Sequence, residues 1–255
     1  MSSALIRELR AGPRRVIRGG GLTRGGAFTE LEFAGLPEPV CRYLAGAIAV
    51  GVPLDGAIHL DVRGHLRHRR WVPFRAGYEL TRALDFTGLG AAGEVVVGVE
   101  RCVGGVAQQQ ARLAGIVPLR DTVGEQVSRS SAGRAALAAL MLPTALLPRF
   151  GVRWTTRGSD EISAALSVHN VPVELHLRID GDGRPLAAVL DRWGDPDGTG
   201  AWGWHPFGAV FTGEARFAGL TVPATGRVGW FPGTDRWRDG ELLRFRVTSL
   251  RRTAG

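Results

Sequence analysis

The sequence contains no lysine, only two cysteines and no long apolar run. All 32 basic residues are arginine, a bias more typical of a GC-rich genome than of selection for a phosphate-binding guanidinium fork. Cys41 and Cys102 form no CxxC pair, which argues against a disulfide framework and against a cysteine-rich metal site. No window approaches the ~18 apolar residues that a membrane-spanning helix requires.

Motifs that carry catalytic or cofactor chemistry are also lacking. The sequence has no GxSxG, HExxH or Walker motif, and the glycines at residues 19–21 precede no strand and helix, so a phosphate cradle is not predicted. His65 and His68 have no carboxylate or cysteine at ligand spacing, which favours a solvated strand end over a metal site. We therefore predict no catalytic residue, no cofactor and no metal, and we favour a protein that is not an enzyme.

The N-terminal region and the charge restrict location and partners. Residues 1–35 are rich in arginine and glycine and predict a flexible lead-in that lacks the apolar core of a secretory signal. With a formal net charge of +8, we expect a cytoplasmic protein that makes weak peripheral contact with an anionic membrane surface. The arginines fall mainly on alternate strand positions and are not grouped with aromatic residues, so nucleic acid is not an expected partner.

Short alternating segments make up most of the remaining chain. Residues 58–117 and 151–250 show apolar residues at every second position, as in Ile58, Leu60 and Val62, which predicts half-buried strands. Four strands are predicted up to residue 113 and about seven after residue 151. A sheet of about eleven strands is larger than usual, so we expect it to curl.

Two segments instead show helical spacing. Residues 37–50 begin with prolines suited to a first helical turn, and residues 128–142 begin with serines and continue into an alanine- and leucine-rich run that Pro143 ends. We predict a mainly β fold with α (α+β): a large curved antiparallel sheet, or half-barrel, with helices packed in its concavity. Residues 36–252 are predicted to form one β-rich domain, and the second helix is expected to cross the concavity.

Seven tryptophans are the strongest side-chain signal. Most lie in or beside predicted strands, where a large ring with one N–H group usually belongs to a core. The competing interpretation is an aromatic-lined cavity. On that interpretation Tyr43, Trp154, Trp202 and Trp204 line the cavity, and Arg42 or Arg153 lies at its mouth to bind an anionic head group.

Three segments carry a resemblance to a known family. Residues 36–44 (LPEPVCRYL), 71–76 (WVPFRA) and 142–154 (LPTALLP followed by VRW) resemble an uncharacterised bacterial family of similar length, which implies a single domain and assigns no catalytic residue. Where that family has a tyrosine after the arginine of a late strand, this chain has Arg192-Trp193. The predicted architecture is also similar to the periplasmic lipoprotein-carrier half-barrel, which shelters acyl chains, although the chain departs from it by lacking an export signal.

These observations leave three hypotheses. The first is a binder of a hydrophobic or amphipathic small molecule, such as a lipid, held between sheet and helices. The second is a cofactor-free enzyme, such as a cyclase, which predicts a buried titratable residue at Glu100 or Asp191. The third is a structural or partner-binding protein whose sheet is filled and whose outer arginines, Arg244 and Arg246 among them, make the contacts.

Overall fold

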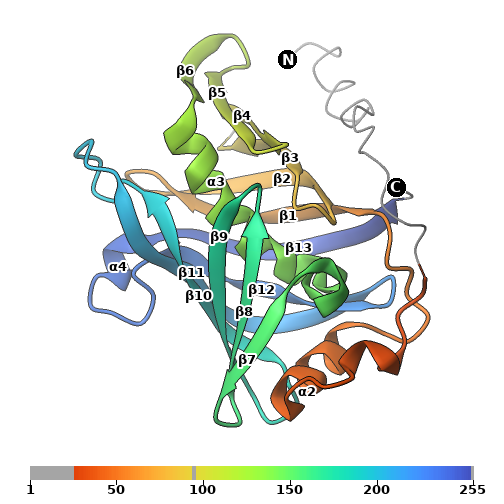
Figure 1. Cartoon of the computed structure of the whole chain (residues 1–255). Helices are drawn as coiled ribbons and strands as arrows, with labels where there is room; N and C mark the ends of the chain where they lie inside the picture. Colours follow the sequence, from red (N-terminus) through yellow and green to blue (C-terminus); the bar gives the residue numbers. More distant parts are fainter. Residues whose placement is uncertain (1–25, 94–95, 254–255) are drawn as a thin grey trace.

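A single antiparallel sheet dominates the computed structural model, which describes residues 26–93 and 96–253 (Figure 1). Its thirteen strands follow the order β6-β5-β4-β3-β2-β1-β13-β12-β11-β10-β9-β8-β7. The first six are β1 (Ala57–Arg67), β2 (Trp71–Thr81), β3 (Phe86–Ala92), β4 (Val96–Val103), β5 (Val106–Leu113) and β6 (Val117–Val123). The others are β7 (Arg153–Arg157), β8 (Glu161–Val168), β9 (Val171–Ile179), β10 (Pro185–Gly194), β11 (Gly203–Phe217), β12 (Leu220–Trp230) and β13 (Glu241–Thr253).

Two meanders make up this sheet. Strands β1 to β6 pair in sequence order, as do β7 to β13, and the meanders join where the C-terminal strand β13 pairs with β1. Strands β6 and β7 are the two edges and do not pair with each other, so the sheet stays open. Figure 1 shows it curving strongly, as the right-handed twist of so many strands requires.

The connection between the meanders crosses the concavity. Helix α3 (Glu125–Ala138) continues into the 3-10 turns η2 (Ala139–Met141), η3 (Pro143–Leu146) and η4 (Pro148–Phe150). The helix contacts β5 and β6 on one side and β8, β9 and β10 on the other. This confirms the predicted helix across the concavity, although it begins at Glu125 and not at residue 128.

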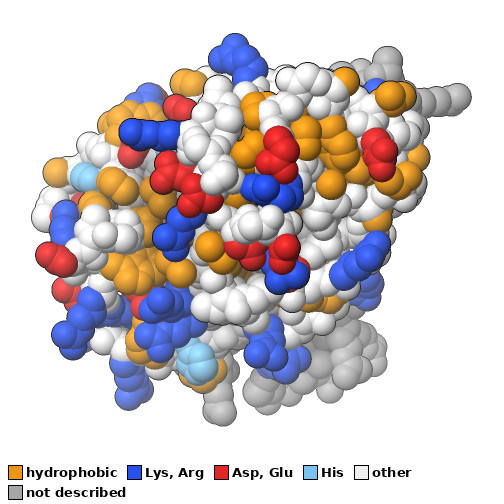
Figure 2. Space-filling model, turned by 90° about the horizontal axis from the view of Figure 1, so that it is seen from below, with side chains coloured by type: hydrophobic (Ala, Val, Ile, Leu, Met, Phe, Trp, Pro, Cys, Tyr) orange, Lys and Arg blue, Asp and Glu red, His pale blue; other side chains and the backbone are white. Residues whose placement is uncertain are grey.

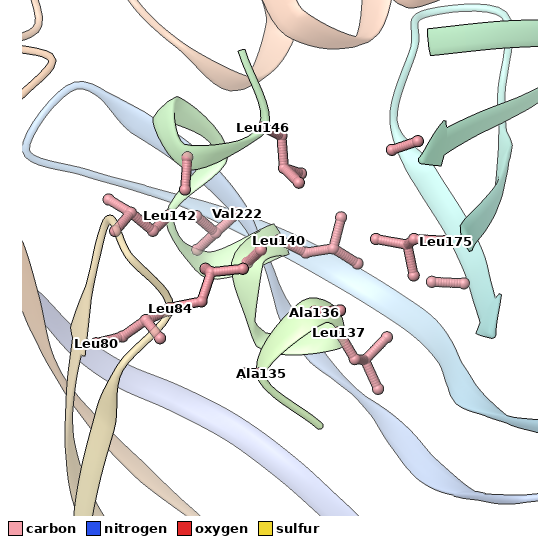
Figure 3. Packing of buried hydrophobic residues seen from close by; sticks show 14 of the residues in the cluster. Leu80, Leu84, Ala135, Ala136, Leu137, Leu140, Leu142, Leu146, Leu175 and Val222 are labelled. Carbon is pink, nitrogen blue, oxygen red and sulfur yellow. The ribbon is translucent and has the colours of Figure 1, made fainter. Parts of the chain in front are cut away.

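Buried side chains from the connection pack against both meanders. Figure 3 shows Leu140 and Leu142 of the connection among Leu80 of β2, Leu175 of β9 and Val222 of β12. All five side chains are at most 2% exposed. The connection therefore forms one core with both halves of the sheet, which is why an alanine- and leucine-rich helix with few charges is stable here.

The strand count differs from the expected eleven because two strands were missed. Strand β3 carries Gly88 and Gly90 on the inner face, where alternation would need apolar side chains. Strand β6 carries Pro118 and lies at a sheet edge, where proline removes no ladder hydrogen bond. Glycine and proline are depleted in strands, so pattern alone gave no strand in either segment.

The fold begins earlier than residue 36. Phe28 is 1% exposed, its backbone N–H donates to the carbonyl of Val52 at 2.8 Å, and its ring packs on that of Phe33 at 5.4 Å. Phe28 therefore anchors residues 26–35, which include the turn η1 (Glu30–Phe33), to the core, and the predicted flexible lead-in is wrong for this segment. Its remainder, residues 1–25, lies outside the described residues.

Two further helices are shorter than α3. Helix α2 (Glu38–Ala47) packs against β7, β8 and β12, and the single turn α4 (Trp237–Gly240) precedes β13. Among the helices of the described residues, none has the length and apolar character needed to cross a membrane.

Candidate functional site

Two arginines project into the concave side of the sheet beside α3. Arg192 lies on β10 at a position whose inner-face neighbours are Leu190 and Gly194, and Arg134 lies on α3 itself. A cation on the apolar face of a sheet is costly unless it is paired or hydrogen-bonded. The two side chains satisfy this requirement in different ways.

Arg134 is held by an ion pair. Its Nη1 lies 2.9 Å from Oε2 of Glu100 on β4, and its guanidinium carbon lies 4.5 Å from the ring centroid of Phe86 and 5.1 Å from that of Tyr78. Burial by itself lowers the pKa of Arg134, but the charge of Glu100 and the Tyr78 hydroxyl outweigh it and raise that pKa. Arg134 is thus a fixed, compensated cation.

Arg192 has no carboxylate partner within the described residues. Its Nε donates to the carbonyl oxygen of Ser130 on α3 at 3.0 Å, and its guanidinium carbon lies 4.4 Å from the centroid of Phe207 and 5.2 Å from that of Trp230. Burial lowers the pKa of Arg192 to about 10, with a further contribution from the nearby charge of Arg134. The side chain therefore stays cationic at neutral pH but is poorly solvated.

The outer nitrogens of Arg192 remain available. Neither Nη1 nor Nη2 has a hydrogen-bond partner among the described residues, and neither is a fully buried polar atom. Gly133 of α3 leaves room for this arrangement, since a Cβ there would lie 3.0 Å from Cγ of Arg192. The fork is oriented by Ser130 and two aromatic rings, and its outer N–H groups have no partner among the described residues, a geometry suited to carboxylate or phosphate.

An apolar row adjoins this arginine on the same face. Val228 lies two residues before Trp230 on β12, and the register places it opposite Leu243 of β13. Leu243 is opposite Leu66 of β1, and Leu66 is opposite Val72 of β2. Leu66 is 37% exposed and the other three are partly exposed. This part of the concave face is therefore not fully covered by α3.

We define the inner-face site as Arg192, its aromatic neighbours Phe207 and Trp230, and the row Val228, Leu243, Leu66 and Val72. It places one unpaired cation beside a strip of partly exposed apolar side chains. Such a surface complements an amphipathic molecule with an anionic end.

The predicted aromatic residues do not form one lining. Tyr43 of α2 and Trp154 of β7 do meet, with ring centroids 5.7 Å apart, but they are 2% and 8% exposed, and Nε1 of Trp154 donates to the carbonyl of Leu146 at 2.9 Å. Burial raises the pKa of the Tyr43 hydroxyl. Both belong to the packed core beside α2, as expected if the aromatic residues are core residues and do not line a cavity.

Trp202 and Trp204 lie far from that pair in the fold, at the hairpin between β10 and β11. They are 36% and 48% exposed, and Trp204 packs edge-on against Trp193 at 5.3 Å. Alternation places Trp204 on the outer side of β11, because Phe207 and Ala209 occupy the inner side. The predicted shared strand face is not formed, because Trp202 precedes the first residue of β11.

The two predicted arginines are also separated from the inner-face site. Arg42 pairs with Glu38 on α2 at 3.1 Å and donates to the carbonyl of Ser159 at 2.7 Å. Arg153 is exposed on the outer side of β7, beside a shallow depression that includes Ser167 and Glu174. Neither is placed to contact a ligand on the concave face.

The residues expected for an enzyme divide in a similar way. Asp191 is exposed on the outer side of β10, and Glu100 is inside but paired with Arg134 and with the side-chain amide of Gln109 at 2.9 Å. No group of three or more metal-ligating side chains occurs within residues 26–93 and 96–253. Arg192 was noted in the sequence without a role, and its position two residues after the inward Leu190 is the signal that identifies it as an inner-face arginine.

Comparisons with known proteins give one clear result. Solved structures similar to this chain include a domain assigned as an outer membrane lipoprotein-sorting protein from Vibrio parahaemolyticus, with 11% identity, a TM-score of 0.43 and coverage of 79% of this chain and 87% of that one. A LolA superfamily protein from Nitrosomonas europaea shows 8% identity, a TM-score of 0.38 and coverage of 84% of this chain and 91% of that one. No curated protein matches. Residues 26–241 match the model of the family of unknown function DUF6544, and the chain belongs to that family.

Proposed function

We propose that the protein binds a lipid-like amphipathic small molecule with an anionic head group at the inner-face site. Arg192 contacts the head group, and the row Val228, Leu243, Leu66 and Val72 contacts the apolar tail. The observation that carries the proposal is the guanidinium of Arg192, which lies against the rings of Phe207 and Trp230 beside an apolar row and has no carboxylate partner among the described residues.

Energetics favour both halves of such a ligand. A hydrogen bond to a charged partner contributes roughly 1.5–3 kcal/mol when its groups are shielded from water. Each methylene group removed from water contributes about 0.8 kcal/mol. A ligand gains both contributions when several of its methylenes lie along the apolar row and its carboxylate or phosphate lies at Arg192.

A fluorescent fatty acid, 11-(dansylamino)undecanoic acid, tests the head-group contact. Its methyl ester has the same tail and no charge. The variant Arg192→Gln should weaken binding of the acid by about tenfold or more, the loss expected from one charged hydrogen bond, and should leave binding of the ester nearly unchanged. The matched control is Arg178→Gln, since Arg178 is an exposed arginine on β9.

The tail contact has a separate test. Leu66→Gln should weaken binding of acid and ester alike, because it removes apolar surface and leaves Arg192 in place. Native mass spectrometry of protein purified from cells should show a co-purifying amphiphile that Arg192→Gln loses. Equal binding of the acid by the wild-type protein, Arg192→Gln and Arg178→Gln would contradict the proposal.

A further inference from the structure

A second concentration of charge lies on the opposite, outer face of the sheet. The register places Arg63 of β1 directly opposite Arg246 of β13, and Arg227 of β12 directly opposite Arg244 of β13. Like charges at directly opposed positions of neighbouring strands destabilise a sheet. Two such pairs side by side indicate that something outside the sheet compensates them.

The carboxylates of the described residues do not supply that compensation in full. Glu241, whose side chain is 6% exposed, lies 2.7 Å from Nε of Arg244 and 3.8 Å from Nη1 of Arg227. Arg63 and Arg246 are exposed and have no ion pair or hydrogen bond with described residues. One buried acid therefore compensates only two of the four arginines.

Two other outward carboxylates of neighbouring strands are engaged elsewhere. Asp61 of β1 accepts from the hydroxyl of Ser249 at 2.6 Å and lies 3.6 Å from Arg251. Glu214 of β11 pairs with Arg184 at 3.3 Å. Neither is paired with Arg63 or Arg246, so two guanidinium groups remain unpaired.

The four arginines surround a depression of about 600 Å³. Gly64, Phe245 and Gly226 are aligned in register across β1, β13 and β12, and their side-chain positions point to the inner face, so backbone forms the floor. The hydroxyl groups of Thr212 and Thr225, 3.1 Å apart, lie at the edge.

Arg244 is also oriented in advance. Its guanidinium carbon lies 4.3 Å above the ring of Trp71, while Nε is bound to Glu241. A planar guanidinium fixed on one edge and one face presents its remaining N–H groups in a defined direction. Figure 2 shows one face of the molecule, on which arginine side chains gather toward the lower left.

We propose that this outer-face depression binds a phosphate-bearing anion, with Arg63, Arg227, Arg244 and Arg246 as its ligands. Guanidinium groups match phosphate oxygens through paired, charge-assisted hydrogen bonds, and threonine hydroxyls add further donors. The depression has room for a diphosphate or a phosphate ester. The phosphate can belong to a soluble molecule or to a lipid head group, and the site is independent of the inner-face site.

Pyrophosphate tests whether the site binds a soluble phosphate. Its binding is measured by calorimetry and by thermal unfolding, at constant ionic strength set with sodium chloride. Pyrophosphate should raise the unfolding temperature of the wild-type protein, and Arg246→Gln or Arg63→Gln should weaken binding about tenfold or more. Without ligand and at low salt, the same two variants should unfold ~2 °C or more above the wild type, because each removes a like-charge pair. The matched control Arg101→Gln lies on the outer face of β4 opposite Thr87 and Gln108 and should show neither effect.

The lipid arm uses sedimentation with phosphatidylglycerol vesicles, with phosphatidylcholine vesicles as reference. Binding to the first alone, lost in Arg246→Gln and competed by pyrophosphate, assigns the site to a lipid head group. Pyrophosphate binding without vesicle binding assigns it to a soluble phosphate. Equal losses in Arg246→Gln and Arg101→Gln in either arm, or no binding in both arms, would overturn the proposal.

Discussion

The ion pair between Arg134 and Glu100 gives the most demanding test of the concave interior. Glu100→Gln keeps the shape of the side chain and its hydrogen bond with Gln109, but it leaves Arg134 without a counter-ion. Removing one partner of a fully buried pair costs about 3–5 kcal/mol. Here the two side chains are 25% and 22% exposed, and solvent screening reduces the expected loss to about 2 kcal/mol.

That loss corresponds to a fall of roughly 4–8 °C in the unfolding temperature for a protein of this size. Thermal unfolding followed by circular dichroism measures it directly. Glu125→Gln is the matched control, because Glu125 pairs with Arg129 at 2.8 Å on the same helix but is 82% exposed, and an exposed i,i+4 pair contributes only about 0.3–0.5 kcal/mol.

A double variant separates charge from packing. Glu100→Gln combined with Arg134→Met removes both charges, so much of the lost stability should return. Equal unfolding temperatures for Glu100→Gln and Glu125→Gln would refute the reasoning, because they would mean that water screens the interior pair as fully as the surface pair.

Two further predictions concern the thiols and the start of the fold. Burial raises the pKa of Cys102 to about 11, and its side chain is 0% exposed, so in native protein at pH 8 a thiol reagent should modify the partly exposed Cys41 well before Cys102. The Cys102 thiol should also lower the stability of the protein as the pH rises from 9.0 towards about 11, because only the unfolded state releases the thiol proton in that interval. Cys102→Ala should reduce this loss of stability at alkaline pH. An unchanged pH profile would contradict the raised pKa of Cys102. Phe28→Ala should cost about 3–5 kcal/mol in the free energy of unfolding measured with urea. Leu31→Ala, at a side chain that is 82% exposed, should cost little. Similar losses would mean that Phe28 does not anchor residues 26–35 to the core.

Local pattern was sufficient for most strands and for both main helices. Alternation of apolar and polar residues identified eleven of the thirteen strands, since a half-buried strand needs this pattern whatever its neighbours are. It failed at β3, where Gly88 makes room for the ring of Tyr78: a Cβ there would lie 2.2 Å from a ring carbon. The reason for that glycine is on another strand and cannot be seen within its own segment.

The candidate site was less accessible to sequence reasoning than the fold. The large tryptophan side chains suggested a cavity lining, yet Trp154 belongs to the core and Trp204 lies on the surface. Arg192 has an ordinary local sequence, and its importance comes from Ser130, Phe207 and Trp230, which lie on three other elements.

The amino-acid sequence by itself determined the period of each segment, the lack of catalytic and metal-binding motifs, and the placement of arginines on alternate strand positions. These are properties of neighbouring residues, and backbone geometry converts them directly into strands and helices. Only the tertiary structure decided which face of each strand became concave and which arginines acquired a partner. Strand register and the path of α3 bring together residues that are distant in the chain, so Arg134 meets Glu100 while Arg192, Arg63 and Arg246 remain unpaired among the described residues.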